Sequence, residues 1–239
     1  MQKSGTYHND FELLDEANLS AKDCQLISIH TTPQVGIGQR ALLCVSPAGN
    51  VLWDCITYLD DDTVARIRSY GPVGAIVISH PHYYSTCLHW AQALDCKVFL
   101  SAEDEEWVMR RPASPSEEGE MELWTGQRMS FGLDHEFLCV KTGGHFPGSS
   151  VLSWPRVGKL LVADTIQVVP SGIYHVDRPK GTVSFTFMWS YPNFVSERSL
   201  FFFSPFFCGD DVLMLVMWID SPPPGRGVDD LGCDQGSAL

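Results

Sequence analysis

The chain has 239 residues, of which 44% are hydrophobic and 11% aromatic, which is enough to bury the core of one large domain. A formal net charge of −13 and an isoelectric point near 4.9 disfavour nucleic acids and anionic membranes as partners, because both bind basic surfaces. The N-terminus holds no apolar stretch typical of a secretory signal, and the eight cysteines are scattered without a CxxC pair. These features predict a cytoplasmic protein with reduced thiols.

The N-terminal part of the chain is expected to begin with a loose polar arm over residues 1–22. Apolar runs then predict strands at 24–30, 41–45 and 51–55, with a hairpin turn at 46–50 that contains Pro, Gly and Asn. Acidic residues at the start of segment 60–68 favour a helix there, since they suit the positive end of the helix dipole.

The middle of the chain alternates strands and helices. A fully apolar strand is expected at 74–79, a helix at 86–94 and a short strand at 97–100. Residues 101–104 resemble a capping box before a helix at 105–109, and the acidic run 103–106 is interpreted as its solvated face. After a polar loop around 112–120, shorter strands are expected near 128–131, 137–141, 150–154 and 159–163. This order predicts an α/β layered domain.

Four polar residues stand at the ends of apolar strands or in a glycine-rich loop. His80 and His82 follow the strand at 74–79, and imidazoles at i and i+2 can face the same side and hold one metal ion. His145 lies in the loop at 143–148 between glycines, and Asp164 closes the apolar run 160–163. The pattern therefore predicts a metal site.

Together with Asp54 at the end of an earlier strand, these residues occur in an order that resembles the metallo-β-lactamase fold superfamily. The likeness covers roughly residues 24–190 and rests on four motifs in the correct order. It implies an αββα sandwich, with two mixed β-sheets packed face to face, helices outside and a metal site at one edge. Members are mostly hydrolases of esters, thioesters, amides or phosphoesters that use one or two zinc ions, sometimes iron or manganese.

The resemblance implies a role for each of these residues, and the second motif of the chain differs from the usual pattern of the superfamily. His80, His82 and His145 match the ligands of the first metal, Asp164 matches the carboxylate that often bridges two metals, and Asp54 matches a supporting aspartate. The usual second motif is H-x-H-x-D-H, but here Tyr84 replaces its aspartate and Ser85 its third histidine. Because those two residues help to hold the second metal, we expect one zinc ion rather than two, with iron or manganese as alternatives.

Three imidazoles and one water form the open tetrahedral arrangement of a catalytic zinc site, in which the pKa of the water falls to about 7. We expect Asp164 to orient that water, whereas neither Tyr84 nor Ser85 is a base at neutral pH. One interpretation is a mononuclear hydrolase that cleaves an ester, thioester or amide bond of a small molecule. The alternative is a degenerate, non-catalytic protein that binds a ligand or serves as a scaffold, or a truncated inactive isoform.

Other candidate residues are expected to lie apart from the site. His89 shares a predicted helix face with Ser85 but is expected to pack beside Trp90, and Cys87 is expected to face elsewhere. His175 follows Asp164 too soon to match the last histidine of the superfamily.

The domain is expected to span residues 23–192, followed by an atypical tail at 193–239. The apolar runs of the tail are broken by Pro205 and by Gly209 well short of the ~20 residues that a membrane span needs. Val195 and Ser196 are what an in-frame splice donor would encode, and the Phe-, Ser- and Leu-rich run after them is typical of translated intron. We therefore interpret the tail as retained-intron or frameshifted sequence, which sequencing of the transcript across codons 190–200 would test.

Overall fold

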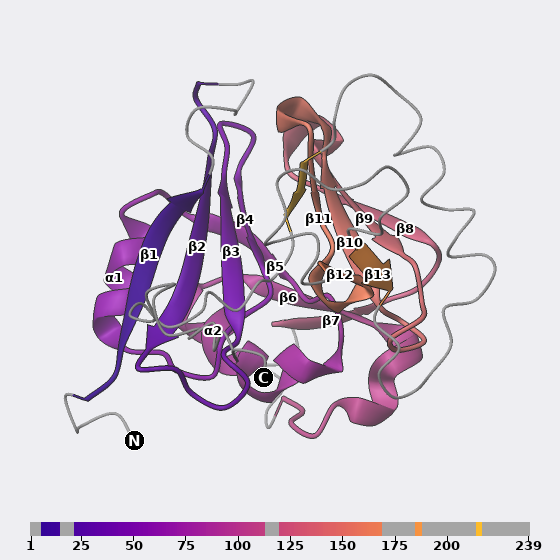
Figure 1. Cartoon of the computed structure of the whole chain (residues 1–239), viewed down its shortest axis with the longest axis horizontal. Helices are drawn as coiled ribbons and strands as arrows, with labels where there is room; N and C mark the ends of the chain where they lie inside the picture. The colour runs from indigo at the N-terminus through magenta and orange to yellow at the C-terminus, as the bar shows by residue number, and fades with distance from the viewer. Residues whose placement is uncertain (1–5, 15–21, 113–119, 169–184, 188–213, 217–239) are drawn as a thin grey trace, which may run out of the picture.

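The computed structural model describes residues 6–14, 22–112, 120–168, 185–187 and 214–216. These residues form two β-sheets that face each other, with two α-helices packed on the outer side of the first sheet (Figure 1). The site residues lie at one edge of this arrangement, where loops from both sheets meet.

The first sheet has seven strands in the order β1-β2-β3-β4-β5-β6-β7. Their bounds are β1 His8–Leu14, β2 Gln25–Thr32, β3 Arg40–Val45, β4 Asn50–Trp53, β5 Val73–Val77, β6 Lys97–Ser101 and β7 Met121–Trp124. Strands β1 to β4 pair antiparallel, and β4 to β7 pair parallel. The change follows from the connections, because α1 (Asp61–Arg68) and α2 (Cys87–Leu94) supply the crossovers from β4 to β5 and from β5 to β6 that parallel neighbours require.

The second sheet has five strands in the order β14-β11-β10-β9-β8. Their bounds are β8 Arg128–Phe131, β9 Phe137–Lys141, β10 Ser150–Trp154, β11 Lys159–Leu161 and β14 Met214–Val216. All pairs are antiparallel except that of β11 with β14. A separate two-stranded ribbon pairs β12 (Ile166–Val168) with β13 (Phe185–Phe187).

Side chains along the strands of the first sheet point alternately to its two faces, so the hydrophobic core consists of two clusters, one on each face. In β2, Leu26 packs between the sheets, whereas Ile27 packs under the helices. Trp154 of β10 belongs to the cluster between the sheets, and Trp90 of α2 to the cluster between sheet and helices. Both indoles are fully buried, so a sheet that is apolar on both faces is covered on both.

Short 3₁₀ helices connect several of these elements. They are η1 Pro81–Thr86, η2 Ala102–Trp107, η3 Leu133–His135, η4 Pro155–Val157 and η5 Ala163–Thr165. Two of them, η1 and η5, carry expected site residues.

The structure corrects three expectations. The N-terminal arm is not loose over His8–Leu14, because this segment pairs with β2 along its whole length as the edge strand β1. The expected capping box and α-helix are wrong, because η2 is a 3₁₀ helix and the Ser101 hydroxyl donates to Glu103 instead of capping the backbone. The acidic run is not fully solvated, since Asp104 is completely buried.

The expected fold class is confirmed, because two mixed sheets pack face to face with helices on the outside. Among the residues that the structure describes, no α-helix follows α2, so a second outer helical layer is not part of the described structure. His175 and, apart from β14, the tail at 193–239 lie outside the described residues. No helix in the described part of the chain is long and apolar enough to cross a membrane.

Candidate metal centre

The first two histidines follow the end of β5. The backbone N–H of Ile78 still bonds to the carbonyl of Phe99 at 3.1 Å, which keeps this segment in line with the sheet. His80 is in extended conformation and precedes η1, which begins with Pro81, a residue whose fixed φ suits the first helical position. The turn of η1 brings the ring of His82 back beside that of His80, with ring centroids 4.9 Å apart.

The third histidine comes from the loop between β9 and β10. Gly143 and Gly144 have φ of 63° and 95°, a region that glycine adopts without steric cost. The N–H groups of Thr142 and Gly143 donate to the carbonyl of Ser149 at 2.8 and 3.0 Å, which closes the loop around His145. This loop is bound to the β5 end, since the N–H of Ser150 donates to the carbonyl of Ser79 at 3.0 Å.

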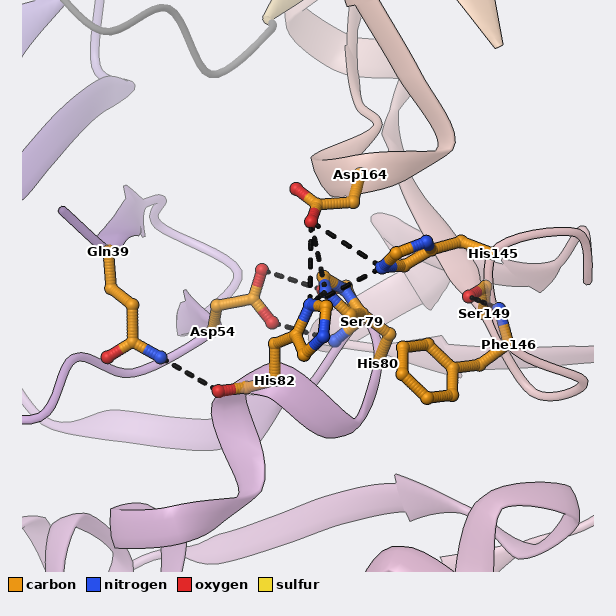
Figure 2. Close-up of polar contacts among 9 residues, drawn as sticks. All are labelled: Gln39, Asp54, Ser79, His80, His82, His145, Phe146, Ser149 and Asp164. Carbon is orange, nitrogen blue, oxygen red and sulfur yellow. Dashed lines mark hydrogen bonds and ion pairs between the residues drawn. The ribbon is translucent and has the colours of Figure 1, made fainter. Parts of the chain in front are cut away.

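The carboxylate comes from η5, directly after β11. Ala163 has a φ of 43°, and the N–H of Thr165 donates to the carbonyl of Val162 at 3.0 Å. This tight turn directs Asp164 toward the three imidazoles (Figure 2). The four side chains therefore come from connections of both sheets.

Four potential ligand atoms converge, all within 4.8 Å of one another. His82 Nδ1 lies 3.0 Å from His80 Nε2 and 3.3 Å from His145 Nε2. Asp164 Oδ2 lies 3.4 Å from His80 Nε2 and 3.6 Å from each of the other two nitrogens. A tetrahedral ion with bonds of 2.0–2.1 Å separates its ligand atoms by about 3.3–3.4 Å, which is close to these five separations.

The sequence places Asp54 nearby, and the structure shows what it does. Asp54 is buried and accepts two hydrogen bonds from Ser79, from the backbone N–H at 2.7 Å and from the hydroxyl at 2.9 Å. Because the hydroxyl proton goes to Asp54, the Ser79 oxygen accepts from Nδ1 of His80 at 2.8 Å. The lone pair of His80 is thereby placed on Nε2, the atom that faces the other ligands.

Electrostatics favour the protonation states that a metal needs. Burial lowers the pKa of His80, against the raising effect of the nearby Asp164 carboxylate, so the imidazole is neutral at pH 7. Burial alone would raise the pKa of Asp164, but contacts with His80 and His82 outweigh it and hold the pKa well below its usual range. Burial also raises the pKa of Asp54 well above its usual range, although both bonds from Ser79 act in the opposite direction.

The positions that depart from the superfamily pattern supply no further ligand. Tyr84 is buried, and burial raises the pKa of its phenol above the usual range, so it is neutral. Ser85 is exposed. Neither Cys87 nor His89 belongs to the cluster, and of the two only Cys87 is buried.

Sequence reasoning missed two residues that shape the site. The role of Ser79 depends on its contact with Asp54, and only its place between a strand and His80 hinted at it. Phe146 was part of the loop motif, but its ring lies against His145 and His82, with centroids 4.8 and 5.2 Å away (Figure 2). It forms an apolar wall beside the candidate metal centre.

A scan against protein-family models finds none that matches the chain. Among curated proteins, the chain is similar to the uncharacterized protein YmaE of Bacillus subtilis (strain 168), with 39% identity over 183 residues. The match covers 74% of this chain and 60% of that protein, so the chain spans less than two thirds of the relative's length.

Solved structures give the fold. The chemotaxis sensor ODP from T. denticola in its apo state covers 87% of this chain and 86% of its own, with a TM-score of 0.53 and 17% identity. The metallo-β-lactamase DIM-1 covers 68% and 73%, with a TM-score of 0.51 and 16% identity. The metal-soaked Flv1 flavodiiron core from Synechocystis sp. PCC6803 covers 67% and 43%, with a TM-score of 0.50 and 13% identity. The resemblance expected from the order of the motifs is thus confirmed at the level of the fold: the protein has the metallo-β-lactamase fold.

Proposed function

We propose that the protein is a mononuclear metal-dependent hydrolase that cleaves an ester, thioester or amide bond of a small molecule. The observation that carries the proposal is the convergence of three imidazole nitrogens and one carboxylate oxygen within 4.8 Å of one another, close enough to hold a single ion. The fold adds support, because the superfamily that the sequence resembles consists mostly of hydrolases.

Zinc is the metal that we propose. His80, His82 and His145 would hold it as neutral ligands, and Asp164 would complete the set or release its place to a water. Iron or manganese is the alternative, since a flavodiiron core is among the structures with this fold. One ion is favoured over two, because a neutral buried phenol at Tyr84 and an exposed hydroxyl at Ser85 replace ligands of the second site.

A bound zinc ion acts as a Lewis acid and lowers the pKa of a water ligand. The protein's own residues prepare the place for that chemistry. Ser79 and Asp54 fix the tautomer of His80, and Phe146 packs against the rings of His82 and His145. Asp164, charged at neutral pH, accepts a hydrogen bond from the attacking water and so orients it.

The test combines metal content with turnover. We expect about one zinc or iron per chain by elemental analysis, and hydrolysis of at least one substrate in a panel of generic esters and thioesters. His82→Ala removes a ligand and should abolish both, whereas His89→Ala, which changes an exposed histidine outside the cluster, should abolish neither. A folded wild-type protein that binds no metal would contradict the proposal.

A second candidate function is a non-catalytic protein that binds a metal or small ligand or acts as a scaffold. One observation favours it: the two positions that replace the usual aspartate and histidine provide no base, since Tyr84 stays neutral and Ser85 is a hydroxyl. One metal per chain with no turnover on the panel would support this alternative.

We also propose that the protein works in the cytoplasm. The six cysteines in the described part of the chain are all free thiols, as is usual in a reducing compartment. Imaging of a fluorescent fusion tests this, and secretion into the medium would contradict it.

A further inference from the structure

A hollow of about 500 Å³ opens beside the candidate metal centre. Its lining includes His82 of the cluster and the wall residue Phe146, so it adjoins the place where the proposed reaction occurs. The remaining lining consists of Pro81, Tyr84, Ser85, Trp107, Met109 and Arg110. Its size falls within the roughly 300–1,000 Å³ of small-molecule sites.

Three aromatic side chains, those of Tyr84, Trp107 and Phe146, contribute to the walls of the hollow. The rings of Trp107 and Phe146 meet edge to face, with centroids 5.5 Å apart. Trp107 is 39% exposed and Met109 is 90% exposed, so large apolar surfaces face solvent at the mouth. Side chains of this kind suit a flat apolar ligand, because aromatic rings pack well and methionine adapts to irregular shapes.

Arg110 is the only cationic side chain among the described lining residues, and no carboxylate accompanies it there. Its neighbour Arg111 pairs with Glu105 at 3.0 Å, whereas no ion pair joins Arg110 to any residue that the structure describes. The chain carries a net charge of −13, so an anionic substrate is repelled by most of the surface. A single arginine beside an apolar hollow therefore provides the local attraction that such a substrate needs.

We propose that this hollow is the substrate pocket and that the substrate is an aromatic ester, thioester or amide with one negative charge. The aromatic body packs against Trp107, Met109 and Phe146, and Arg110 pairs with the anionic group at the end remote from the cleaved bond. The position of that bond rests on the proposed function: water adds to the carbonyl carbon, the bond to the leaving group breaks, and an acid and an alcohol, thiol or amine are released.

The test measures binding without turnover. The probes are 2-naphthoate, a flat aromatic monoanion, and its neutral counterpart 2-naphthamide, titrated by calorimetry into the full chain after removal of metal. Metal is removed so that the carboxylate cannot gain affinity from an ion. We expect the naphthoate to bind about fivefold more tightly, the preference that a partly exposed ion pair supplies.

Substitutions at single residues test which side chains cause the preference for the naphthoate. Arg110→Gln should give both probes equal affinity, whereas Arg111→Gln, which changes the adjacent arginine outside the lining, should keep the preference. Trp107→Ser should weaken both probes about tenfold, and Met109→Ser serves as a second wall variant if that protein does not fold. Equal affinity in the wild type, binding of neither probe, or a preference that survives Arg110→Gln would each overturn the proposal.

This design separates the pocket from the proposed function. If the protein binds no metal and hydrolyses nothing, but the naphthoate preference depends on Arg110, the hydrolase fails and the pocket stands. If neutral alkyl esters are hydrolysed while neither probe binds, the hydrolase stands and the pocket fails.

Discussion

Among single side chains, Ser79 links the buried Asp54 to His80, because its hydroxyl donates to one and accepts from the other. Ser79→Ala removes both bonds of the hydroxyl and leaves the tautomer of His80 unset. We expect zinc affinity to fall about 10- to 100-fold, as is typical when the partner of a ligating histidine is removed. Competition titration with a zinc-binding dye measures this. Ser85→Ala, at an exposed position, is the control, and an unchanged affinity of Ser79→Ala would contradict the role.

Asp104 predicts a pH dependence of stability. It is fully buried, and burial raises its pKa from 3.8 to about 6, although the N–H of Gly148 donates to it at 2.8 Å. The folded state therefore binds a proton more tightly than the unfolded state, so this residue makes stability fall as pH rises from about 4 to about 6 and adds no further change above that. The difference between the two pKa values corresponds to roughly 3 kcal/mol.

Asp104→Asn keeps an oxygen acceptor for Gly148 and removes the titration. We expect the difference in unfolding free energy between variant and wild type to shift in favour of the variant between pH 4 and pH 6. Urea denaturation at several pH values measures it, and the exposed Glu106→Gln serves as a control. A difference that stays constant with pH would contradict the raised pKa.

Among the secondary-structure elements, helix α1 is capped at its N-terminus by Asp60. The carboxylate accepts from the N–H of Thr63 at 2.8 Å and from the hydroxyl of Tyr58 at 3.0 Å. Asn9 of β1 donates to the Thr63 hydroxyl at 2.9 Å, so the same cap ties the edge strand to the helix. Asp60→Ala should therefore cost about 1–2 kcal/mol of unfolding free energy.

Chemical denaturation checks the cost of the cap. Asp62→Ala, in the exposed first turn of the same helix, should cost only a few tenths of a kcal/mol. Equal costs for the two variants would show that the dipole, not the cap, stabilises the helix start.

Elements with strong local signals were predictable from the sequence. The acidic start of α1 and the apolar runs of β5, β9 and β10 placed these elements within a few residues of their observed bounds. The sequence does not predict β1 and β7, because their residues, mostly exposed or half-buried, carry little apolar periodicity, and pairing with a neighbour holds them in the sheet. The sequence wrongly predicts an α-helix in place of η2, because a capping pattern does not determine which hydrogen bonds its serine makes.

The sequence likewise predicts some properties of the candidate metal centre and not others. His80, His82, His145 and Asp164 were predictable as a group because each ends a strand or lies in a glycine-rich loop, and strand ends meet at one edge of a sheet. Their tautomers, the wall formed by Phe146 and the hollow bounded by Trp107 depend on contacts between distant segments. No local pattern carries that information.

For the whole molecule, metal binding and stability are coupled. A ligand that binds only the folded state stabilises it by about 2.7 kcal/mol at 100 times its dissociation constant. For a chain of this size that corresponds to a rise in Tm of roughly 5–10 °C. We expect zinc to raise the Tm of the wild type, and a chelator to reverse the rise.

Thermal melts with and without zinc measure this effect. His145→Ala should lose the zinc dependence, whereas His135→Ala, which changes an exposed histidine of η3, should keep it. An equal rise in His145→Ala would mean that zinc binds elsewhere.

The origin of the four potential ligands in connections of both sheets has a kinetic consequence. His80 and His82 follow β5 of the first sheet, whereas His145 and Asp164 belong to connections of the second. Their atoms can converge only after the two sheets have docked, which is a late event for contacts between segments so far apart in the chain. Interactions absent from the folding transition state slow unfolding and leave the folding rate nearly unchanged. The ion would therefore bind only after the two sheets have packed together, and it would slow unfolding of the assembled domain.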